Sequence, residues 1–367
     1  MRFWIVGGGT GGHVYPALAV AEALRDAEPE ALVTWVGTEG GMEAEIVARE
    51  GLPFVSVPGG GVHGVGPRRM VRNGLRLLRG VSVASDLLAQ ERPDALLTTG
   101  GYVSVPVALA ARMRRVPGLV FLPDIEPALS VKFVARLAAR VGVTVEDSRE
   151  FLPAEKVVVT GYPLGERVKR WERATGREAL GLPEGERVLL VFGGSRGARS
   201  LNRATVANLP ALLGRAHVVH VTGTLDWEGV AQAREALSGE EQARYHVYPY
   251  LHEEMGAALA AADLVVSRAG ASILGEFPYF GLPAVLVPYP YAWRYQKTNA
   301  NWLAARGAAL VVADEALAET LVPTVQTLFE DRARLSAMAR AARELARPEA
   351  ARRLAELLLS QGGRGES

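Results

Sequence analysis

The amino-acid sequence predicts an α/β fold in which two Rossmann-like, doubly wound domains face a central cleft. Short apolar runs alternate with amphipathic stretches along most of the 367 residues, which favours parallel sheets covered by helices. A glycine-rich loop also follows an apolar run and precedes an amphipathic stretch in each half of the chain. The length fits this interpretation, because about 150 residues per domain would give two or three domains.

The first half contains apolar runs that are typical of buried parallel strands. These runs are Phe3–Val6, Ala31–Val36, Phe54–Val57, Ala95–Thr98 and Leu119–Leu122. Amphipathic stretches such as Ala17–Ala27 lie between them and predict helices, with Pro16 suited to a first helical turn. The pattern restarts after Gly161-Tyr162-Pro163. We therefore expect a first domain over residues 1–163.

The second half repeats the alternation. Its expected strands are Arg187–Phe192, His217–Val221, Tyr245–Tyr248, Leu264–Ser267 and Ala284–Pro288. The charged segment Leu164–Glu186 contains a proline and several glycines, so it predicts a linker with one helix. The tail Asp331–Leu359 is helical by propensity and is interrupted near Pro348. We expect a second domain over residues 164–344.

The composition excludes several classes of protein. The 41 Lys and Arg residues balance 40 Asp and Glu residues, which argues against a general nucleic-acid binder. No apolar run is long enough for a transmembrane helix. The chain has no cysteine, and its start lacks a signal-peptide core, so we expect a cytoplasmic protein without disulfides or thiol chemistry. His217 and His220 would point to opposite faces of a strand, and no metal site is predicted.

The first glycine loop, Gly7 to His13, includes Thr10, Gly11 and Gly12. Free backbone N–H groups at the start of the following helix suit a phosphate group. The glycine spacing also satisfies the dinucleotide fingerprint, so a dehydrogenase that binds NAD is an alternative. A tight turn without a ligand is a second alternative.

The second glycine loop follows the strand expected at Arg187–Phe192. It contains Gly194, Ser195, Arg196 and Gly197. The serine hydroxyl can donate a hydrogen bond to a phosphate oxygen, and the arginine adds positive charge. A further turn, with Gly100, Gly101 and Tyr102, follows the strand expected at Ala95–Thr98. Ligands of open α/β sheets bind at the carboxyl ends of strands, where these turns lie.

Two more segments of the second half are candidate ligand sites. Small residues at Ala269, Gly270 and Ala271 precede an expected helix that carries Glu276. Its carboxylate could accept hydrogen bonds from a ribose diol, or it could simply be a solvated helical residue. Gln296 lies in an aromatic and polar segment that suits a sugar, or forms an ordinary loop.

The string Gly8-Gly9-Thr10-Gly11-Gly12-His13-Val14-Tyr15-Pro16 resembles the opening of the MurG family, the peptidoglycan N-acetylglucosaminyltransferases of glycosyltransferase family 28. The resemblance spans roughly residues 4 to 310. Further blocks agree in order, namely Gly100–Ser104, Gly193–Asn202, Arg268–Ala271 with Glu276, Gly281–Ala284 and Gln296 to Ala300.

The resemblance implies an inverting, metal-independent GT-B enzyme without a cofactor. Such an enzyme moves N-acetylglucosamine from UDP-N-acetylglucosamine to a lipid-linked muramyl-pentapeptide, converting lipid I to lipid II in cell-wall synthesis. The acceptor domain would come first and the UDP-sugar domain second, and a C-terminal helix at about 345–360 would return to the first domain. The enzyme would lie on the cytoplasmic face of the cell membrane, and other cell-wall enzymes could be partners.

The resemblance also assigns roles to single residues. Thr10, Gly11, Gly12 and His13 match the loop at the acceptor pyrophosphate. Ser195 and its neighbours match the donor-phosphate loop, and Ala269 to Ala271 match a second backbone patch at the nucleotide. Glu276 matches the ribose-binding carboxylate, and Gln296 matches a glutamine near the donor sugar.

The sequence departs from the family at three places. The usual His-Glu-Gln-Asn block is replaced by Phe121-Leu122-Pro123-Asp124, and the usual Gly-Asn-Pro-Val-Arg turn by Gly161-Tyr162-Pro163-Leu164-Gly165. Tyr295 replaces the first of two glutamines. Two alternatives therefore remain open, a GT-B transferase for a different sugar and a nucleotide-sugar-binding protein with weakened catalysis.

Two residues are candidates for the base that inverting transfer needs. His13 lies where the first glycine loop becomes a helix, and a neutral imidazole can accept a proton near pH 7. Asp124 follows the strand expected at Leu119–Leu122. We expect His13 to be the base, with Asp124 as the competitor. A hydrogen-bonded residue at a helix start is the structural alternative for His13.

A basic amphipathic segment at residues 68–79 predicts binding to an anionic membrane surface. Four arginines, Arg68, Arg72, Arg76 and Arg79, would form one stripe on a helix. Val71, Leu75 and Leu78 would form an adjacent apolar stripe. The alternative is a surface helix whose apolar stripe packs on its own domain.

Overall fold

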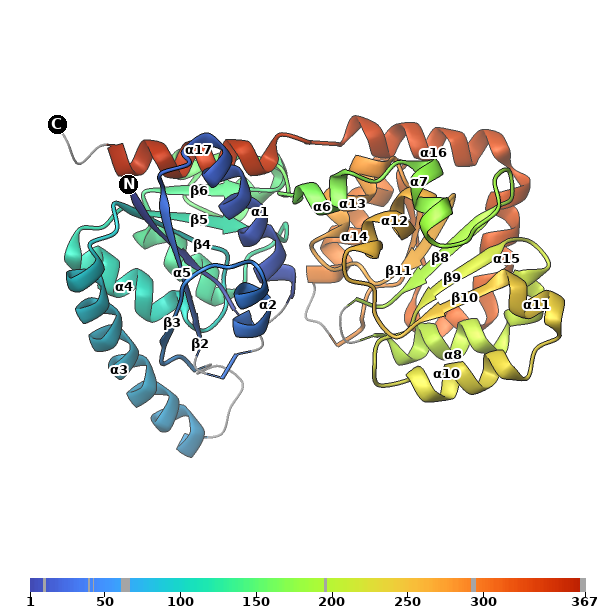
Figure 1. Ribbon diagram of the computed structural model, residues 1–367, viewed down its shortest axis with the longest axis horizontal. Helices are drawn as coiled ribbons and strands as arrows, with labels where there is room; N and C mark the ends of the chain where they lie inside the picture. The colour runs from blue at the N-terminus through green and yellow to red at the C-terminus, as the bar shows by residue number, and fades with distance from the viewer. Residues whose placement is uncertain are drawn as a thin grey trace. The chain divides into compact units, whose positions relative to one another are not determined.

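The computed structural model describes residues 1–8, 11–38, 40–41, 43–60, 67–194, 197–291 and 295–363, without the side chains of residues 67–71 (Figure 1). The chain forms two compact units. Unit 1 comprises Met1–Gly165 and Arg347–Ser367, and unit 2 comprises Glu166–Ala346.

Unit 1 is built on a seven-stranded sheet in the order β3-β2-β1-β4-β5-β6-β7, and every neighbouring pair is parallel. Val6 on β1 lies opposite Val36 on β2 and Thr98 on β4, so the loops after these strands leave the same edge. The strands are β1 (Arg2–Val6), β2 (Leu32–Thr38), β3 (Phe54–Val57), β4 (Ala95–Thr98), β5 (Gly118–Leu122), β6 (Arg140–Val143) and β7 (Val157–Val159).

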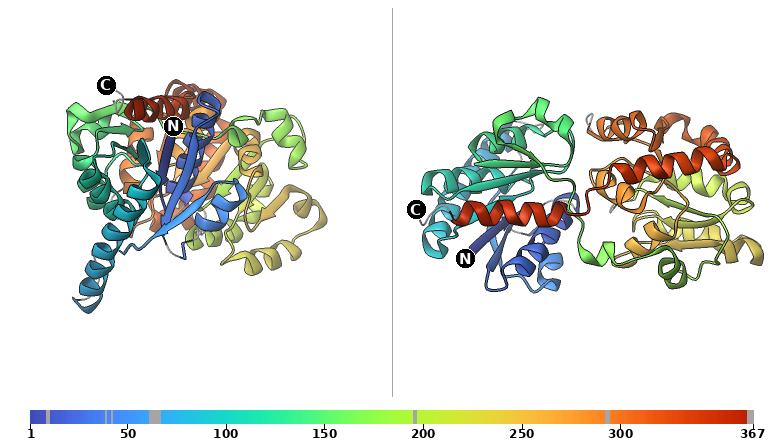
Figure 2. Two further views of the ribbon diagram at one scale, coloured as in Figure 1. Left: turned by 60° about the vertical axis from the view of Figure 1, so that its left-hand side comes forward. Right: turned by 90° about the horizontal axis from the view of Figure 1, so that it is seen from above.

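Helices cover both faces of this sheet. Gly142 on β6 lies under Leu354 of α17, whereas Val141 and Val143 pack in the cluster that contains Val134 of α5. Helix α17 lies beside α1, as Figure 2 shows from above. The helices are α1 (Gly11–Ala27), α2 (Glu43–Arg49), α3 (Pro67–Glu91), α4 (Ser104–Arg114), α5 (Leu129–Leu137), α17 (Ala350–Gly362) and the 3-10 helices η1 (Glu146–Phe151) and η2 (Ala154–Lys156).

Unit 2 has a six-stranded parallel sheet in the order β10-β9-β8-β11-β12-β13. Its strands are β8 (Val188–Phe192), β9 (His217–Val221), β10 (Tyr245–Tyr248), β11 (Leu264–Ser267), β12 (Ala284–Leu286) and β13 (Ala309–Val311). One apolar cluster joins Leu189 and Val191 of β8 to Leu201 of α8 and Leu328 of α15.

Helices also connect the strands of unit 2. They are α6 (Glu166–Lys169), α7 (Arg173–Ala179), α8 (Arg199–Ala207), α9 (Leu209–Leu213), α10 (Trp227–Glu235), α11 (Gly239–Arg244), α12 (Glu254–Ala261), α13 (Ile273–Phe280), α14 (Tyr295–Ala305), η3 (Asp314–Ala316), α15 (Leu317–Glu330) and α16 (Arg332–Glu344). On the face that α7 and α12 cover, a Cβ at Gly176 would touch the backbone of Ala257, so this glycine allows the close approach of the two helices.

The α/β fold class is confirmed, and each strand expected from the sequence is present with small shifts at its ends. Three short strands, β6, β7 and β13, were not expected from the sequence. Helix α1 begins at Gly11, so Pro16 lies inside it and not in its first turn. The segment Leu164–Glu186 contains two short helices, α6 and α7, and not one.

Candidate functional site

The first glycine loop leads directly into α1. The Gly7 N–H donates to the Val36 carbonyl (3.2 Å), which holds the start of the loop against β2. Gly11 is buried and Gly12 is exposed at the first turn of α1, where backbone N–H groups have no helical partner. Thr10 lies outside the described residues. The exposed helix start is the part of this loop that can approach an anion.

Two hydrogen bonds fix His13 on the neighbouring loop. Nδ1 of His13 lies 2.7 Å from the Thr99 carbonyl oxygen, and the Thr99 hydroxyl donates to the His13 carbonyl (2.7 Å). Because a carbonyl oxygen can only accept, the neutral ring carries its proton on Nδ1. Nε2 therefore keeps its lone pair, and within the described part of the chain it has no partner. This is the tautomer that a general base needs.

The glycine pair after β4 contacts the first glycine loop. Gly100 and Gly101 have φ angles of +120° and +89°, which side chains rarely adopt. A Cβ at Gly100 would lie 2.8 Å from the His13 ring, and one at Gly101 would lie 2.6 Å from the Gly8 carbonyl oxygen. The structure thus brings His13 and these predicted glycines together. Tyr102 is 63% exposed beside them.

Asp124 lies on the loop after β5, the strand next to β4. It is half-buried, whereas Glu126 on the same loop is only 5% exposed. The Thr144 hydroxyl bonds the Pro123 carbonyl (2.8 Å) and holds the start of this loop. Sequence reasoning missed Glu126, although an acidic residue just after a strand is the signal that selected Asp124.

A second buried carboxylate that sequence reasoning missed lies under the first glycine loop. Glu43, at the start of α2, is fully buried and accepts a hydrogen bond from the Thr38 N–H (2.7 Å). A Cβ at Gly8 or at Gly41 would overlap its carboxyl group. The glycines therefore give room to a carboxylate from the protein itself, which a glycine count cannot reveal.

The second glycine loop turns tightly after β8. Gly194 and Gly197 have φ angles of +85° and +74°, and the Gly197 N–H donates to the Gly194 carbonyl (2.9 Å). Helix α8 begins at Arg199, so the loop ends at a helix start. Ser195 and Arg196 lie outside the described residues. The described ends of the loop have the positive φ angles and the helix start that favour phosphate binding.

Side chains from α14 hold the patch after β11. Gln296 Oε1 accepts from the N–H groups of Ala269 (3.4 Å) and Tyr289 (2.9 Å), and Asn299 Nδ2 donates to the Ala269 carbonyl (3.2 Å). Ala269 therefore uses its backbone groups inside the protein. Gly270 has open space around its Cα, so this glycine is where a ligand can approach the patch, next to half-buried Ala271.

The same contacts fix which end of the Gln296 amide is available. Two N–H donors occupy its oxygen, and within the described residues its Nε2 has no partner. Gln296 can therefore offer a ligand an N–H donor and not an acceptor.

Arg268, which the sequence analysis named only within a family block and gave no role, joins the segments that follow four strands, β8, β11, β12 and β13. Its Nη2 donates to Ser200 Oγ (2.7 Å), and its Nη1 donates to Asp314 (2.6 Å) and to the Val287 carbonyl (3.0 Å). Its guanidinium also lies over the Tyr289 ring, 5.3 Å from the centroid. A buried arginine with this many partners holds the carboxyl edge of the sheet in one arrangement.

Glu276 is half-buried near the start of α13 and accepts a hydrogen bond from the Ser272 hydroxyl (2.8 Å). Burial raises the pKa of this carboxyl from 4.5 to about 7, and the Ser272 hydroxyl opposes that shift. A carboxyl that titrates near neutral pH is a feature of functional sites. The ionised form accepts hydrogen bonds through both oxygens, whereas the protonated form uses one oxygen as a donor and is the weaker acceptor of a hydroxyl group.

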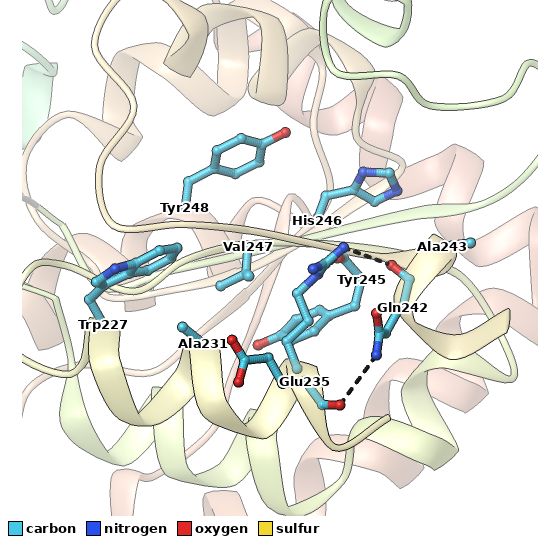
Figure 3. A pocket seen from close by; sticks show the side chains of 10 residues that line it. Trp227, Ala231, Glu235, Gln242, Ala243, Tyr245, His246, Val247 and Tyr248 are labelled. Atoms are coloured by element: carbon cyan, nitrogen blue, oxygen red, sulfur yellow. Dashed lines mark hydrogen bonds between the residues drawn. The ribbon is translucent and has the colours of Figure 1, made fainter. Parts of the chain in front are cut away.

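A pocket of about 440 Å³ lies apart from the predicted site residues, along β10 at the edge of the unit 2 sheet (Figure 3). Its walls come from α10, α11 and β10, with Trp227, Arg234 and Tyr248 among them. Arg234 Nε donates to the Tyr245 carbonyl (3.1 Å), so this arginine covers part of the free strand edge. Across the described ranges, no cluster of three or more possible metal ligands is present.

Comparison with known proteins agrees with this architecture. Residues 3–143 match the glycosyltransferase family 28 N-terminal domain, and residues 188–354 match the C-terminal domain of that family. The Roseiflexus relative, named UDP-N-acetylglucosamine--N-acetylmuramyl-(pentapeptide) pyrophosphoryl-undecaprenol N-acetylglucosamine transferase, is 44% identical over 98% of this chain and 94% of its own. A Desulforudis audaxviator protein of the same name is 38% identical over the whole of both chains.

A solved structure gives the same result. The crystal structure of Acinetobacter baumannii MurG superposes with a TM-score of 0.77 at 29% identity, covering 98% of this chain and 99% of that one. Together, the matched domains, these relatives and the two parallel sheets assign the GT-B fold. The chain belongs to glycosyltransferase family 28 and is a glycosyltransferase of the MurG family.

Proposed function

We propose that this enzyme transfers N-acetylglucosamine from UDP-N-acetylglucosamine to N-acetylmuramyl-(pentapeptide) pyrophosphoryl-undecaprenol in peptidoglycan synthesis, the reaction named in its relatives. The observation that carries the proposal is His13, whose Nδ1 is bonded to the Thr99 carbonyl so that Nε2 keeps its lone pair. In this proposal unit 1 binds the acceptor and unit 2 binds the UDP-sugar.

His13 is the proposed base. Nε2 takes the proton of the acceptor hydroxyl while that oxygen attacks C1 of the sugar. The bond between C1 and the phosphate oxygen breaks, and UDP leaves with the electron pair. The charge that develops on UDP is stabilised by the start of α8, which follows the second glycine loop.

Two side chains of unit 2 are proposed to select the donor. The ionised Glu276 carboxylate accepts hydrogen bonds from the ribose hydroxyls, and Gln296 Nε2 donates to an oxygen of the sugar. The first role is supported by the free carboxylate oxygen of Glu276 within the described residues, and the second by the fixed amide of Gln296.

One departure from the family concerns packing. Tyr162 is 4% exposed, and its ring meets Phe121 edge to face with the centroids 6.1 Å apart. Its side chain therefore belongs to the core of unit 1 and gives no reason to expect a different sugar. A transferase for another sugar and a binding protein with weakened catalysis are the outcomes that an assay must separate.

The test is turnover with a lipid I analogue and a panel of UDP-N-acetylglucosamine, UDP-glucose and UDP-N-acetylgalactosamine, followed by UDP release. We expect turnover with UDP-N-acetylglucosamine to exceed the others at least tenfold. Faster turnover with another sugar would assign a different specificity. A thermal shift with UDP but no turnover on any donor would indicate a binding protein, and a shift with NAD alone would restore the dehydrogenase alternative.

We further propose that α3 holds the enzyme at an anionic membrane surface. Leu75 and Leu78 are 63% and 65% exposed, so these apolar residues do not pack on their own domain. Arg72, Arg76 and Arg79 are exposed beside them. The side chains of Arg68 and Val71 lie outside the described part. None of the described helices is long and apolar enough to cross a membrane.

A further inference from the structure

A chain of buried hydrogen bonds connects the edge of the unit 2 sheet to the second glycine loop. It runs from Tyr245 on β10 through His220 on β9 to Asn202 on α8, and these residues are 1%, 0% and 2% exposed. The Tyr245 hydroxyl lies 2.8 Å from His220 Nδ1, and His220 Nε2 lies 3.0 Å from Asn202 Oδ1. Buried polar groups are costly unless they are bonded, so this chain constrains what surrounds it.

The partners of Asn202 determine the position of every proton in this chain of hydrogen bonds. Its Nδ2 donates to the Thr222 carbonyl (2.9 Å) and to Asp226 Oδ2 (2.9 Å), and both of these atoms accept. Asn202 Oδ1 must then face His220, so Nε2 of His220 carries a hydrogen and donates it. Nδ1 of His220 consequently accepts from the Tyr245 hydroxyl. One arrangement of protons satisfies all of these groups.

His220 does not titrate in the range where the enzyme works. Complete burial lowers the pKa of its imidazole to about 3, so the ring stays neutral at physiological pH. The hydrogen bonds are therefore constant, and the ring acts as a fixed donor rather than as a base.

Both residues that Asn202 binds contact the C-terminal end of the glycine loop, where α8 begins. A Cβ at Gly197 would overlap the Thr222 carbonyl oxygen, so the loop backbone packs directly on that carbonyl. Asp226 pairs with Arg199 (3.3 Å), the first residue of α8, where the loop ends. Displacing Asn202 would therefore release the surface on which the loop rests.

We propose that His220 is a positioning residue for the UDP-sugar, which acts by holding Asn202 so that the end of the glycine loop at Gly197 and the start of α8 at Arg199 are preorganised for a diphosphate. This inference rests on the proposed function, in which that loop binds the donor. A loop that must be ordered during binding loses affinity for its ligand, because the cost of ordering is subtracted from the binding free energy.

The test is His220→Phe, which keeps an aromatic ring and removes both hydrogen bonds. We expect the KM for UDP-N-acetylglucosamine and the Kd for UDP to rise about tenfold. The acceptor KM and the kcat at saturating donor should stay within about twofold, because the loop is intact once the donor is bound. His220→Gln retains an N–H donor for Asn202 and should restore part of the donor affinity.

His217→Phe is the matched control. His217 lies at the other end of the same strand, is 7% exposed, and bonds to His246 (3.2 Å) away from the loop. We expect this variant to lower the thermal midpoint while the donor KM stays unchanged. Such a result separates loss of stability from loss of positioning.

Tyr245→Phe keeps the test open if His220→Phe does not fold, because it removes only the hydroxyl, and a smaller rise of the donor KM is expected. An unchanged donor KM in the folded variants, or an equal rise in His217→Phe, would contradict the proposal. Calorimetry with UDP on the wild type distinguishes a failure of the proposed function from a failure of the positioning role. No binding there overturns the proposed function as well, whereas tight binding that the variants retain overturns the positioning role alone.

Discussion

The glycine loop after β1 and the glycine loop after β8 leave equivalent strands of their sheets, but different contacts hold them. In unit 1 the loop packs against a second glycine turn, with the Gly101 backbone against the Gly8 carbonyl, and His13 is fixed by the backbone and hydroxyl of Thr99. In unit 2, buried side chains hold the edge, with Asn202 bonded to His220 and Arg268 bonded to Ser200.

This difference separates two tasks. A backbone-packed loop that presents one imidazole is suited to a proton transfer, where a small displacement of a single atom decides the rate. A loop braced by buried polar side chains is suited to a diphosphate, whose charge is recognised by preorganised N–H groups. Substitutions around the first loop should therefore change kcat, and those around the second should change the donor KM.

The largest expected effect is the loss of kcat when His13 is replaced. We expect His13→Ala to reduce kcat by about 100- to 10,000-fold, the usual contribution of general-base catalysis. The Kd for UDP should barely change, because the donor loop belongs to unit 2.

Asp124→Asn is the competing variant for the same role. We expect it to reduce kcat much less than His13→Ala does, because Nε2 of His13 carries the lone pair that is available to accept the proton. A large loss in Asp124→Asn beside a mild loss in His13→Ala would move the base to Asp124.

The same substitution in both loops sharpens the comparison. At Gly101 and Gly197 an alanine would adopt a positive φ and also overlap a carbonyl oxygen. We expect each to lower the free energy of unfolding by about 1–3 kcal/mol, measured in urea. Gly101→Ala should lower kcat, and Gly197→Ala should raise the donor KM.

Gly194→Ala is the control for this pair, because Gly194 has a positive φ of +85° but nothing within 4 Å of an added Cβ. Gly194→Ala should lower the free energy of unfolding through backbone strain alone. Equal donor KM values for Gly194→Ala and Gly197→Ala would show that contact with Thr222 is irrelevant to donor binding.

Sequence reasoning located the fold and the loops because both depend on local signals. Apolar runs mark the strands, and glycines mark the turns with positive φ, as at Gly100 and Gly197. It could not find Asn202, Arg268 or Glu43 as supporting residues, because their partners are distant in the chain. Arg268, for example, bonds to Asp314 and Ser200, which lie 46 and 68 positions away.

A vesicle-binding experiment tests whether the membrane-binding surface lies on unit 1 alone. We expect Arg72, Arg76 and Arg79 changed together to Gln to weaken binding to vesicles with anionic lipid, by about 1 kcal/mol per arginine. Vesicle sedimentation at low and high salt measures it. The same changes at Arg332, Arg334 and Arg340, which are exposed on α16 of unit 2, should have no effect. Equal losses in both variants would indicate a general charge effect.

The smallest expected effect concerns the pH dependence of donor binding at Glu276. Its pKa is raised to about 7, so it is largely protonated at pH 6 and ionised at pH 8. Because the ionised form is the one proposed to bind the ribose hydroxyls, donor affinity should rise by up to about tenfold per pH unit below pH 7 and level off above it. Calorimetry with UDP-N-acetylglucosamine measures this, since the diphosphate of the sugar nucleotide does not titrate there.

Two variants decide whether Glu276 is the group responsible. Glu276→Gln should bind weakly at every pH and lose the pH dependence. Ser272→Ala removes the hydroxyl that lowers the pKa of the carboxyl, so the midpoint should move to higher pH. Stability changes in the opposite sense to affinity. The carboxyl titrates higher in the folded state than at its ordinary 4.5, so the wild type should lose stability as pH rises towards 7, and Glu276→Gln should not. A donor affinity that stays pH-dependent in Glu276→Gln would assign the titration to another group of unit 2.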